Sequence, residues 1–385
     1  MSYRAEIPYG CYWSTPFARW QGAYANLNSL ELAAEVARKE LERRAIPREA
    51  IDHGVLGFSV PQKHSFYGLP WVAGMAGLGA IGGQTVMQAC ATGVRALLAG
   101  AQEIESGLSQ VTLTLTCDRT SNGPHLYYPN PRGPGGTGGH EDWVMDNFSC
   151  DPLGPHAMIR TAENVAHRHK ISTGEQHEVV LLREAQYKEA LGGFHQRFMS
   201  RATKLEGDEG IRFSSAEGLA QLKPVLEGGT VTYGGQTHPA DGNAAILLAA
   251  PQKARELSRD PKLRVRLLGF GQARAALAQM PEAPLPAAKR ALEQAGLDIG
   301  AMHAVKTHNP FALNDILFSR QTGVALEKMN NYGCSLVWGH PQGPTGTRSV
   351  IELIEELALR GGGYGLFTGC AAGDTAMAVV IKVGE

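Results

Sequence analysis

The sequence has almost no excess of charge, no long apolar run and no dense set of cysteines. Its 36 Lys and Arg residues nearly balance 37 Asp and Glu residues, which leaves a formal net charge of −1. This balance argues against a general binder of nucleic acid or of an anionic membrane. No apolar stretch reaches the ~18 residues of a membrane span, and the N-terminus lacks the charged and apolar regions of a signal peptide. We expect a cytoplasmic protein.

The signatures of metal and cofactor sites are also missing. The six cysteines form no CxxC pair, so we expect reduced thiols rather than disulfides or a zinc site. The sequence has neither an HExxH motif nor paired carboxylates, and its glycine run at 133–139 does not follow a strand and open a helix as a phosphate loop does. We therefore predict neither a metal nor a bound cofactor.

What the sequence does have is a repeated alternation of strand and helix patterns. With 385 residues, 43% of them hydrophobic, the chain is long enough for two packed halves. The spacing of apolar residues predicts helices at 30–44 and 92–106 and strands at 55–60, 83–88 and 111–116. This alternation is typical of an α/β layer with helices on its faces.

The middle of the chain interrupts the alternation. Prolines and glycines at 119–145 predict a loop without regular structure, and helices are expected around 161–191. Strands are expected again at 229–232 and 244–248. After residue 255 we expect strands at 263–270, 303–307, 365–368 and 376–381 and helices at 285–295, 311–323 and 345–360. We divide the chain into a first half (1–118 with 229–254), an inserted loop domain that covers the site (119–228) and a second half (255–385).

Three turns of small residues carry candidate chemistry. Cys90 lies in the sequence Gln-Ala-Cys-Ala-Thr-Gly, where a predicted strand leads into a predicted helix whose N-terminus would favour a thiolate. His340 lies in Gly-His-Pro before a constrained loop, which suits a general base, and Cys370 lies in a predicted turn between two strands. A thiol nucleophile, an imidazole base and a second thiol that moves a proton suffice for acyl transfer through a thioester.

Each of these residues also has a purely structural interpretation. Cys90 could be a small buried cysteine at a tight turn, and His340 could be a histidine of a surface turn. His308, which follows a predicted strand and opens a predicted helix, could donate a hydrogen bond to a thioester oxygen or simply cap the helix.

Taken together, these segments resemble the thiolases along nearly the whole chain. The resemblance rests on 15–22, 88–93, 158–166 and 229–242 and on the turns around His340 and Cys370. Three positions depart from the usual thiolase pattern. Tyr332-Gly333-Cys334 stands where the family has Asn-Gly-Gly, so Tyr332 could intrude on the site. His308 begins His-Asn-Pro-Phe where most members have Asn-Glu-Ala-Phe, which is similar to the His-Asp-Cys-Phe of sterol-carrier-protein type thiolases. Ala372 replaces a glycine. Its backbone N–H can still donate a hydrogen bond provided that residue 372 needs no positive φ.

The resemblance implies a fold and a reaction. The fold would be α/β with five layers, α-β-α-β-α, built from two similar halves and an inserted loop domain. The reaction would transfer an acyl group between CoA and a 3-oxoacyl-CoA, with Cys90, His308, His340 and Cys370 as catalytic residues. The backbone N–H groups of Cys90 and Ala372 would form an oxyanion hole, and the residues that bind CoA or substrate would be Met158, Thr237 and Phe311.

The resemblance also implies partners and leaves alternatives open. The expected ligands are acyl-CoA and CoA, used as substrates, and the expected assembly is a homodimer or homotetramer. One alternative is a condensing enzyme of the ketoacyl synthase type, which pairs its cysteine with His-His or His-Asn. Another is a CoA-binding subunit that works only with a partner, such as the small zinc-containing acyl-CoA-binding proteins. The aromatic residues Tyr127, Tyr128 and Trp143 could line an acyl pocket or form a subunit contact.

Overall fold

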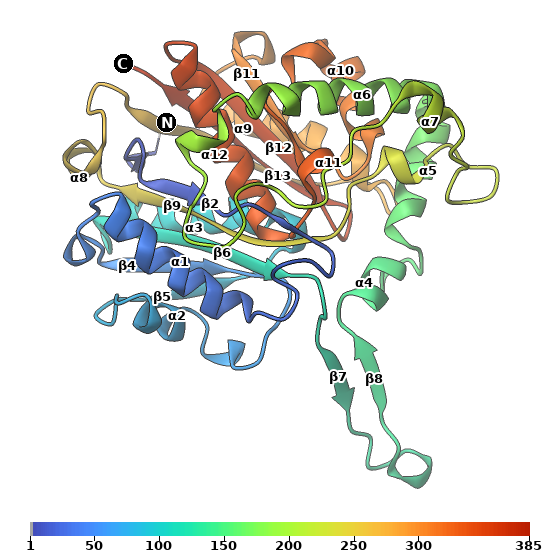
Figure 1. Ribbon diagram of the computed structural model, residues 1–385, viewed down its shortest axis with the longest axis horizontal. Helices are drawn as coiled ribbons and strands as arrows, with labels where there is room; N and C mark the ends of the chain where they lie inside the picture. The colour runs from blue at the N-terminus through green and yellow to red at the C-terminus, as the bar shows by residue number, and fades with distance from the viewer. Residues whose placement is uncertain (1–2) are drawn as a thin grey trace.

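The computed structural model describes residues 3–385 and places the two halves of the chain one against the other (Figure 1). Among the described residues eleven strands form one sheet: nine follow one another in the order β11-β12-β13-β10-β1-β9-β6-β4-β5, and β2 and β3 pair with β9 beside this path. The short strand β1 (Glu6–Ile7) links the two parts of this path because it pairs with β10 on one side and β9 on the other. Each half therefore contributes its own part of the sheet.

The first half forms where strand and helix patterns alternate in the sequence. Its elements are β2 (Tyr12–Ser14), β3 (Ala18–Arg19), α1 (Ser29–Arg43), β4 (His53–Gly57), α2 (Leu69–Met75), β5 (Gly82–Val86), α3 (Thr92–Glu105), β6 (Val111–Arg119), β9 (Ala240–Ala249) and α8 (Pro251–Leu257). Strands β4, β5 and β6 are parallel, as expected where helices connect them, whereas β9 is antiparallel to β6.

The second half repeats this arrangement. Its elements are β10 (Val265–Arg274), α9 (Pro284–Ala295), β11 (Ala304–His308), α10 (Ala312–Thr322), α11 (Ser335–Trp338), α12 (Gly343–Leu359), β12 (Gly363–Ala371) and β13 (Thr375–Val383). Strands β11 and β12 are parallel, and β13 is antiparallel to both β12 and β10.

The packing of helices on the two parts of the sheet gives five layers. Helices α1 and α2 cover the outer face of the first part, and α9 and α10 lie outside the second. Helices α3 and α12 contact each other between the two parts, each lying on the sheet of its own half. The structure thus confirms the expected α/β fold with an α-β-α-β-α order of layers.

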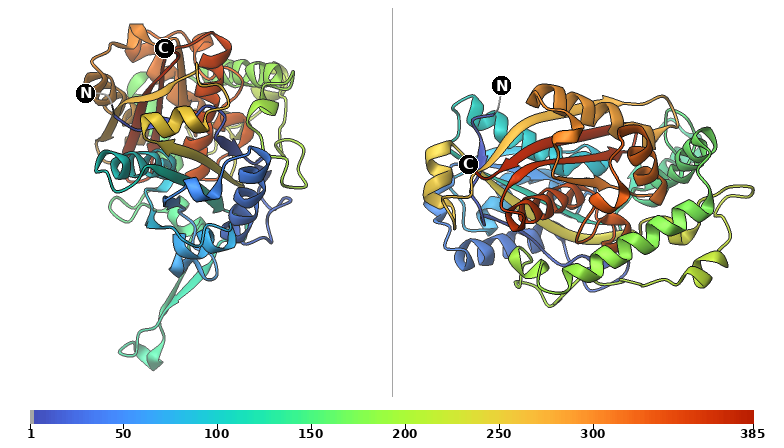
Figure 2. Two further views of the ribbon diagram at one scale, coloured as in Figure 1. Left: turned by 90° about the vertical axis from the view of Figure 1, so that its left-hand side faces the viewer. Right: turned by 90° about the horizontal axis from the view of Figure 1, so that it is seen from above.

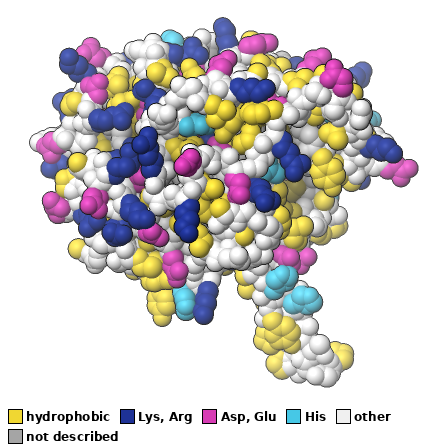
Figure 3. Space-filling view, viewed as in Figure 1, with side chains coloured by type: hydrophobic (Ala, Val, Ile, Leu, Met, Phe, Trp, Pro, Cys, Tyr) yellow, Lys and Arg dark blue, Asp and Glu magenta, His cyan; other side chains and the backbone are white. Residues whose placement is uncertain are grey.

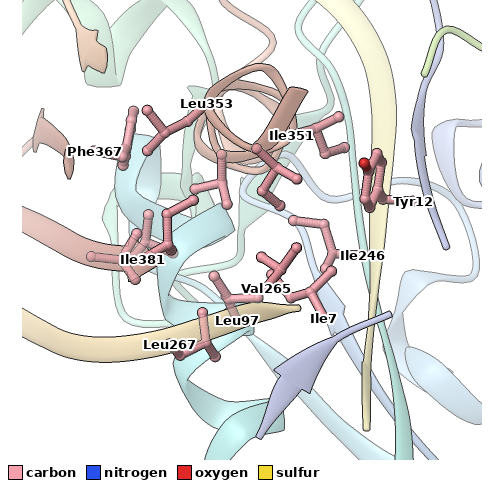
Figure 4. Packing of buried hydrophobic residues seen from close by; sticks show 14 of the residues in the cluster. Ile7, Tyr12, Leu97, Ile246, Val265, Leu267, Ile351, Leu353, Phe367 and Ile381 are labelled. Atoms are coloured by element: carbon pink, nitrogen blue, oxygen red, sulfur yellow. The ribbon is translucent and has the colours of Figure 1, made fainter. Parts of the chain in front are cut away.

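The core around the central helices is apolar and fully buried. Leu97 of α3 and Ile351 of α12 lie in one cluster with Ile246 of β9 and Val265 of β10 (Figure 4). Burying a side chain of this size stabilises the fold by about 1.5–3 kcal/mol. The two central helices are therefore held in fixed positions, and the loops before their N-termini are fixed with them.

The segment between β6 and β9 contains more regular structure than the sequence predicts. A hairpin of β7 (His125–Tyr128) and β8 (Gly139–Asp142) extends away from the body of the molecule (Figure 2). The prediction that 119–145 has no regular element was wrong. The prolines lie outside the two short strands, which satisfy each other's backbone groups.

Helices α4 (Met145–Ser149), α5 (Met158–His169), α6 (Thr173–Ala190) and α7 (Ala216–Ala220) follow the hairpin, as Figure 1 shows. The predicted strand at 229–232 does not form. The Glu163 carboxylate accepts hydrogen bonds from the backbone N–H groups of Thr230 and Val231, so a side chain replaces a strand partner there. The division at 1–118, 119–228, 229–254 and 255–385 stays a prediction.

None of the helices in residues 3–385 combines the length and the apolar character that crossing a membrane requires.

Candidate active site

Cys90 lies between β5 and α3, at the strand-to-helix junction that the sequence predicts. The turn is strained, since Ala89 has a φ of 43°, a value that residues with a side chain rarely adopt. Thr92 stabilises it: its Oγ1 donates to the Ala89 carbonyl at 2.7 Å and accepts from the Gln88 N–H at 2.8 Å. The partly buried thiol is thereby held just before the N-terminus of α3.

The N-termini of α3 and α12 approach each other closely at this point. A Cβ on Gly93 would lie 2.6 Å from the Gly343 carbonyl oxygen and from the Thr347 N, so a larger residue would push the helices apart. Both helix ends present free N–H groups and partial positive charge near the thiol. This close approach explains why a glycine, Gly93, stands three positions after Cys90.

His340 reaches the same place from the loop that precedes α12. Gly339 before it has a φ of 90°, and a Cβ there would meet the His238 ring at 2.7 Å. The His340 Nδ1 lies 2.6 Å from Thr345 Oγ1, while its Nε2 is buried and has no hydrogen-bond partner. If Thr345 accepts from Nδ1–H, Nε2 carries the lone pair of a base.

His308 ends strand β11 and lies face to face with His340. The two ring centroids are 4.1 Å apart, and the rings are tilted by 31°. His308 Nδ1 lies 2.8 Å from Ser335 Oγ, and its Nε2 is likewise buried without a partner. Ser335 Oγ also donates to Asn309 Oδ1 at 3.0 Å, and its one hydrogen serves either acceptor; when it turns to His308 Nδ1, His308 Nε2 carries a hydrogen that it can offer to a ligand. The sulfur of Cys90 and one ring nitrogen of each histidine all lie within 4.8 Å of one another.

Cys370 lies close to this group, but not in the turn that the sequence predicts. It is the second-last residue of β12 and pairs with Ala376 of β13; the turn begins two residues later. The strand continues this far because small residues on both strands let the ladder extend. Asn314 of α10 donates from Nδ2 to the Cys370 sulfur at 3.5 Å. The second thiol is thus buried and held by one donor.

Backbone N–H groups point at the nucleophilic sulfur. The N–H groups of Ala372 and of Cys90 itself lie close enough to the Cys90 Sγ to lower the pKa of the thiol. Ala372 is not among the residues with positive φ, whereas Gly373 and Asp374 are, so alanine is tolerated at 372. These are the two groups that the sequence analysis assigns to an oxyanion hole.

Burial keeps the reacting groups neutral in this structure. It raises the pKa of the Cys90 thiol to about 11, against the smaller opposite effect of the two N–H groups. Burial lowers the pKa of His340 to about 3. It also lowers the pKa of His308, and the charge that His340 would carry lowers that pKa further. Burial raises the pKa of Cys370 as well. In this structure Cys90 is therefore a thiol and both imidazoles are uncharged at neutral pH.

The three residues predicted to bind substrate lie near the site, and each makes different contacts there. Phe311 is buried in one apolar cluster with Cys370, and Met158, the first residue of α5, packs against that cluster. Thr237 uses its N–H to bond the Pro310 carbonyl and its hydroxyl to bond the Ser335 carbonyl. It therefore holds the loop after His308 in place. The binding of CoA by these three residues stays a prediction.

Several polar residues that complete the site were not found from the sequence. Gln342 accepts a hydrogen bond from the Cys90 thiol, Asn314 donates to Cys370, and Ser335 and Thr345 hold the two imidazoles. Asn314 could have been noticed as the polar residue within an apolar stretch of α10. The others lie in loops whose geometry depends on the fold.

Two groups of side chains could hold a metal ion by their spacing alone. One is Cys90 with the two histidines, and the other is Asp151, His156 and Asp374. In the second group both Asp374 oxygens already accept backbone N–H groups, and Asp151 Oδ1 accepts two more.

Comparisons with known proteins agree with the fold along the whole chain. The family model described as thiolase, N-terminal domain, matches residues 13–252, and thiolase, C-terminal domain, matches residues 261–383. The chain is 27% identical over 392 residues to a probable acetyl-CoA acetyltransferase of Escherichia coli (strain K12), covering 96% of this chain and 97% of that protein. It is 28% identical over 383 residues to beta-ketothiolase BktB of Cupriavidus necator, covering 96% of each.

Solved structures give the same result. The human mitochondrial 3-ketoacyl-CoA thiolase in complex with CoA superposes with a TM-score of 0.91 at 26% identity, over 99% of both chains. The acetyl-CoA acetyltransferase of Bacillus anthracis gives the same three values. The chain belongs to the thiolase family. It is an acyltransferase with the activity of a thiolase.

Proposed function

We propose that the protein transfers acyl groups between CoA and 3-oxoacyl-CoA through an acyl-enzyme on Cys90. The observation that carries the proposal is the convergence of three groups at one sulfur. Cys90 Sγ lies within 4.8 Å of ring nitrogens of His308 and His340, and the Ala372 N–H is close enough to lower the pKa of the thiol. An assay of the purified protein against a panel of 3-oxoacyl-CoAs, with CoA present, tests it. If the protein formed a shortened acyl-CoA from none of the 3-oxoacyl-CoAs, the result would contradict the proposal.

In the first half-reaction, His340 Nε2 takes the Cys90 proton as the sulfur attacks the 3-oxo carbon. The developing oxyanion is held by the N–H groups of Cys90 and Ala372, which are already in place. When the bond between C2 and C3 breaks, its electrons go to C2. Cys370 then donates its proton to C2, which releases acetyl-CoA and leaves the remaining acyl group on Cys90.

In the second half-reaction, CoA gives its thiol proton to Cys370 and attacks the acyl-enzyme. Cys90 leaves as a thiolate and regains its proton from His340, so every group returns to its starting state. His308 contributes Nε2–H to the thioester oxygen on which the enolate charge develops. It stays neutral, because a second positive charge 4.1 Å from the His340 ring would be strongly disfavoured.

One observation favours a second candidate, a condensing enzyme that decarboxylates its substrate. Cys90 stands beside two histidines, the pairing that the ketoacyl synthase type uses. The buried second thiol of Cys370 is what favours thiolase chemistry. Release of CO₂ from malonyl-CoA would indicate the second candidate, whereas exchange of the acetyl-CoA C2 protons without it would indicate the first.

We infer that the protein assembles as a homodimer or homotetramer. Strand β5 lies at the edge of the sheet, and Met87 after it is 61% exposed. An unpaired edge of this kind can pair with a second copy. Tyr127 and Tyr128 of the β7–β8 hairpin are also exposed, at the arm on the lower right of Figure 3, which fits a subunit contact better than an acyl pocket. Light scattering on the purified protein checks this inference, and a monomer would contradict it.

We also infer a cytoplasmic location, because all six cysteines are free thiols in the structure. Cell fractionation tests this.

Activity of the purified chain alone would exclude a strict need for a partner subunit.

A further inference from the structure

The backbone of Gln342 has a conformation that is unfavourable for any residue with a side chain. Its φ is 55° and its ψ is −106°, in a region that only glycine adopts readily, and the residue is 5% exposed. The following N–H, that of Gly343, donates to the buried Asp118 carboxylate at 2.9 Å, which fixes the strained position. Strain of this kind persists where the surrounding structure enforces it, and it is concentrated at functional sites.

The strained backbone brings the Gln342 carboxamide to both reacting groups. The Cys90 thiol donates to Gln342 Oε1 at 3.2 Å. The Gln342 side chain also lies beside His340, where it acts on the pKa of that imidazole in the direction opposite to burial. Among residues 3–385, no direct hydrogen bond joins the thiol to either histidine, and His340 Nε2 has no partner of its own within hydrogen-bonding distance.

We propose that Gln342 is a further catalytic residue, whose Oε1 accepts the Cys90 thiol hydrogen at rest and the His340 Nε2–H after the proton has moved. The proposal rests on the proposed function, since it concerns the proton transfer that activates Cys90. The step is balanced: the S–H bond breaks, the N–H bond forms on His340, and no other atom moves. One carboxamide oxygen serves both protonation states, so the transfer needs no rearrangement of the loop.

The other ionisable groups around the pair do not supply this function. Asp118 lies close enough to raise the pKa of Cys90, but its oxygens accept from Ser59, Val60 and Gly343. His308 is bonded to Ser335, and Cys370 is bonded to Asn314. Gln342 is the side chain whose acceptor faces both the thiol and the base.

The test is the pH dependence of Cys90 alkylation by iodoacetamide, followed by peptide mass mapping in the enzyme without substrate. Gln342→Leu removes the carboxamide, and Gln342→Gly removes it while also relieving the backbone strain. We expect both variants to react roughly tenfold more slowly at neutral pH, because the imidazolium that forms as the sulfur attacks has lost its acceptor, and we expect the inflection of the profile to move to lower pH, because the resting thiol has also lost its acceptor. This loss is the scale of one hydrogen bond to a charged group. Gln176→Leu, which removes a buried carboxamide in α6, should keep the wild-type profile.

A wild-type profile in both Gln342 variants would overturn the proposal. A changed pH profile in Gln342→Leu together with a wild-type profile in Gln342→Gly would also overturn the proposal, because the effect would then come from packing. Unfolding midpoints show whether either variant has lost stability, and Gln342→Gly should not. The readout does not use thiolysis. A wild type that alkylates at Cys90 but cleaves no 3-oxoacyl-CoA would defeat the proposed function and leave the Gln342 result standing.

Discussion

At the scale of single residues, the site combines groups that the sequence reveals with groups that only the fold brings in. Cys90 and His340 are recognisable because each lies in a turn of small residues, where a reactive side chain can be reached. Gln342 and Ser335 are not, because glutamine and serine are common in loops, and their value here comes from contacts with residues far along the chain. Four residues predicted as catalytic do lie together, and their chemical roles stay predictions.

Cys370→Ala should separate carbanion protonation from acyl transfer. A carbanion at C2 is far more basic than a CoA thiolate, so losing the Cys370 proton should block the transfer at C2 and still allow acylation of Cys90, from which CoA can leave as a thiolate. It should exchange the C2 protons of acetyl-CoA with deuterium far more slowly than the wild type, measured by NMR. Cys11→Ala, at another buried cysteine, serves as the control and should exchange normally. Normal exchange and turnover in Cys370→Ala would make this thiol merely a small core residue.

His308→Asn should damage enolate formation and leave acylation of Cys90 largely intact. In the proposed mechanism the imidazole donates to the thioester oxygen, whereas backbone N–H groups hold the oxyanion of the acylation step. The expected loss in condensation rate is about 10²-fold or more, the scale of losing one oxyanion-hole donor. His303→Asn, an exposed histidine just before β11, is the matched control. Full condensation and thiolysis rates in His308→Asn would show that another group is the donor.

At the scale of elements, the helices were predictable and the inserted segment was only partly so. Helices α1, α3, α9, α10 and α12 each carry apolar residues at helical spacing, and the structure places all five where the sequence indicates. The β7–β8 hairpin was missed because each strand is too short to show a pattern and forms only by pairing with the other. The inserted segment is also held by charges, and buried charges cannot be told from solvated ones in a sequence.

Asp208 provides the clearest test of how the inserted segment is attached. Its carboxylate accepts two hydrogen bonds from Arg348 of α12, at 2.6 and 2.7 Å, and both side chains of this ion pair are fully buried. Asp208→Ala leaves the buried guanidinium with Glu352 alone. We expect the free energy of unfolding to fall by about 3–5 kcal/mol, because removing one partner leaves a poorly compensated charge.

Urea unfolding measures this loss, and Glu35→Ala provides the contrast. Glu35 pairs with Lys39 on the exposed face of α1, where an ion pair contributes only about 0–1 kcal/mol. If Asp208→Ala lost no more stability than Glu35→Ala, the buried pair would not hold the inserted segment to α12.

At the scale of the whole molecule, the site belongs to neither half alone. Cys90 comes from the first half, and His308, His340 and Cys370 come from the second. They meet because α3 and α12 lie side by side between the two parts of the sheet and direct their N-termini to one place. A protein made from either half alone would carry part of the chemistry and no complete site.

The most direct test of the account is whether Cys90 carries the acyl group. After incubation with acetyl-CoA, intact-mass spectrometry of the wild type should show one acetyl group per chain, and peptide mapping should place it on Cys90. Cys90→Ala should show none, and Cys90→Ser should lose thiolysis by several orders of magnitude, because an alkoxide is far harder to form than a thiolate. An acetyl group that persists on Cys90→Ala would contradict the account.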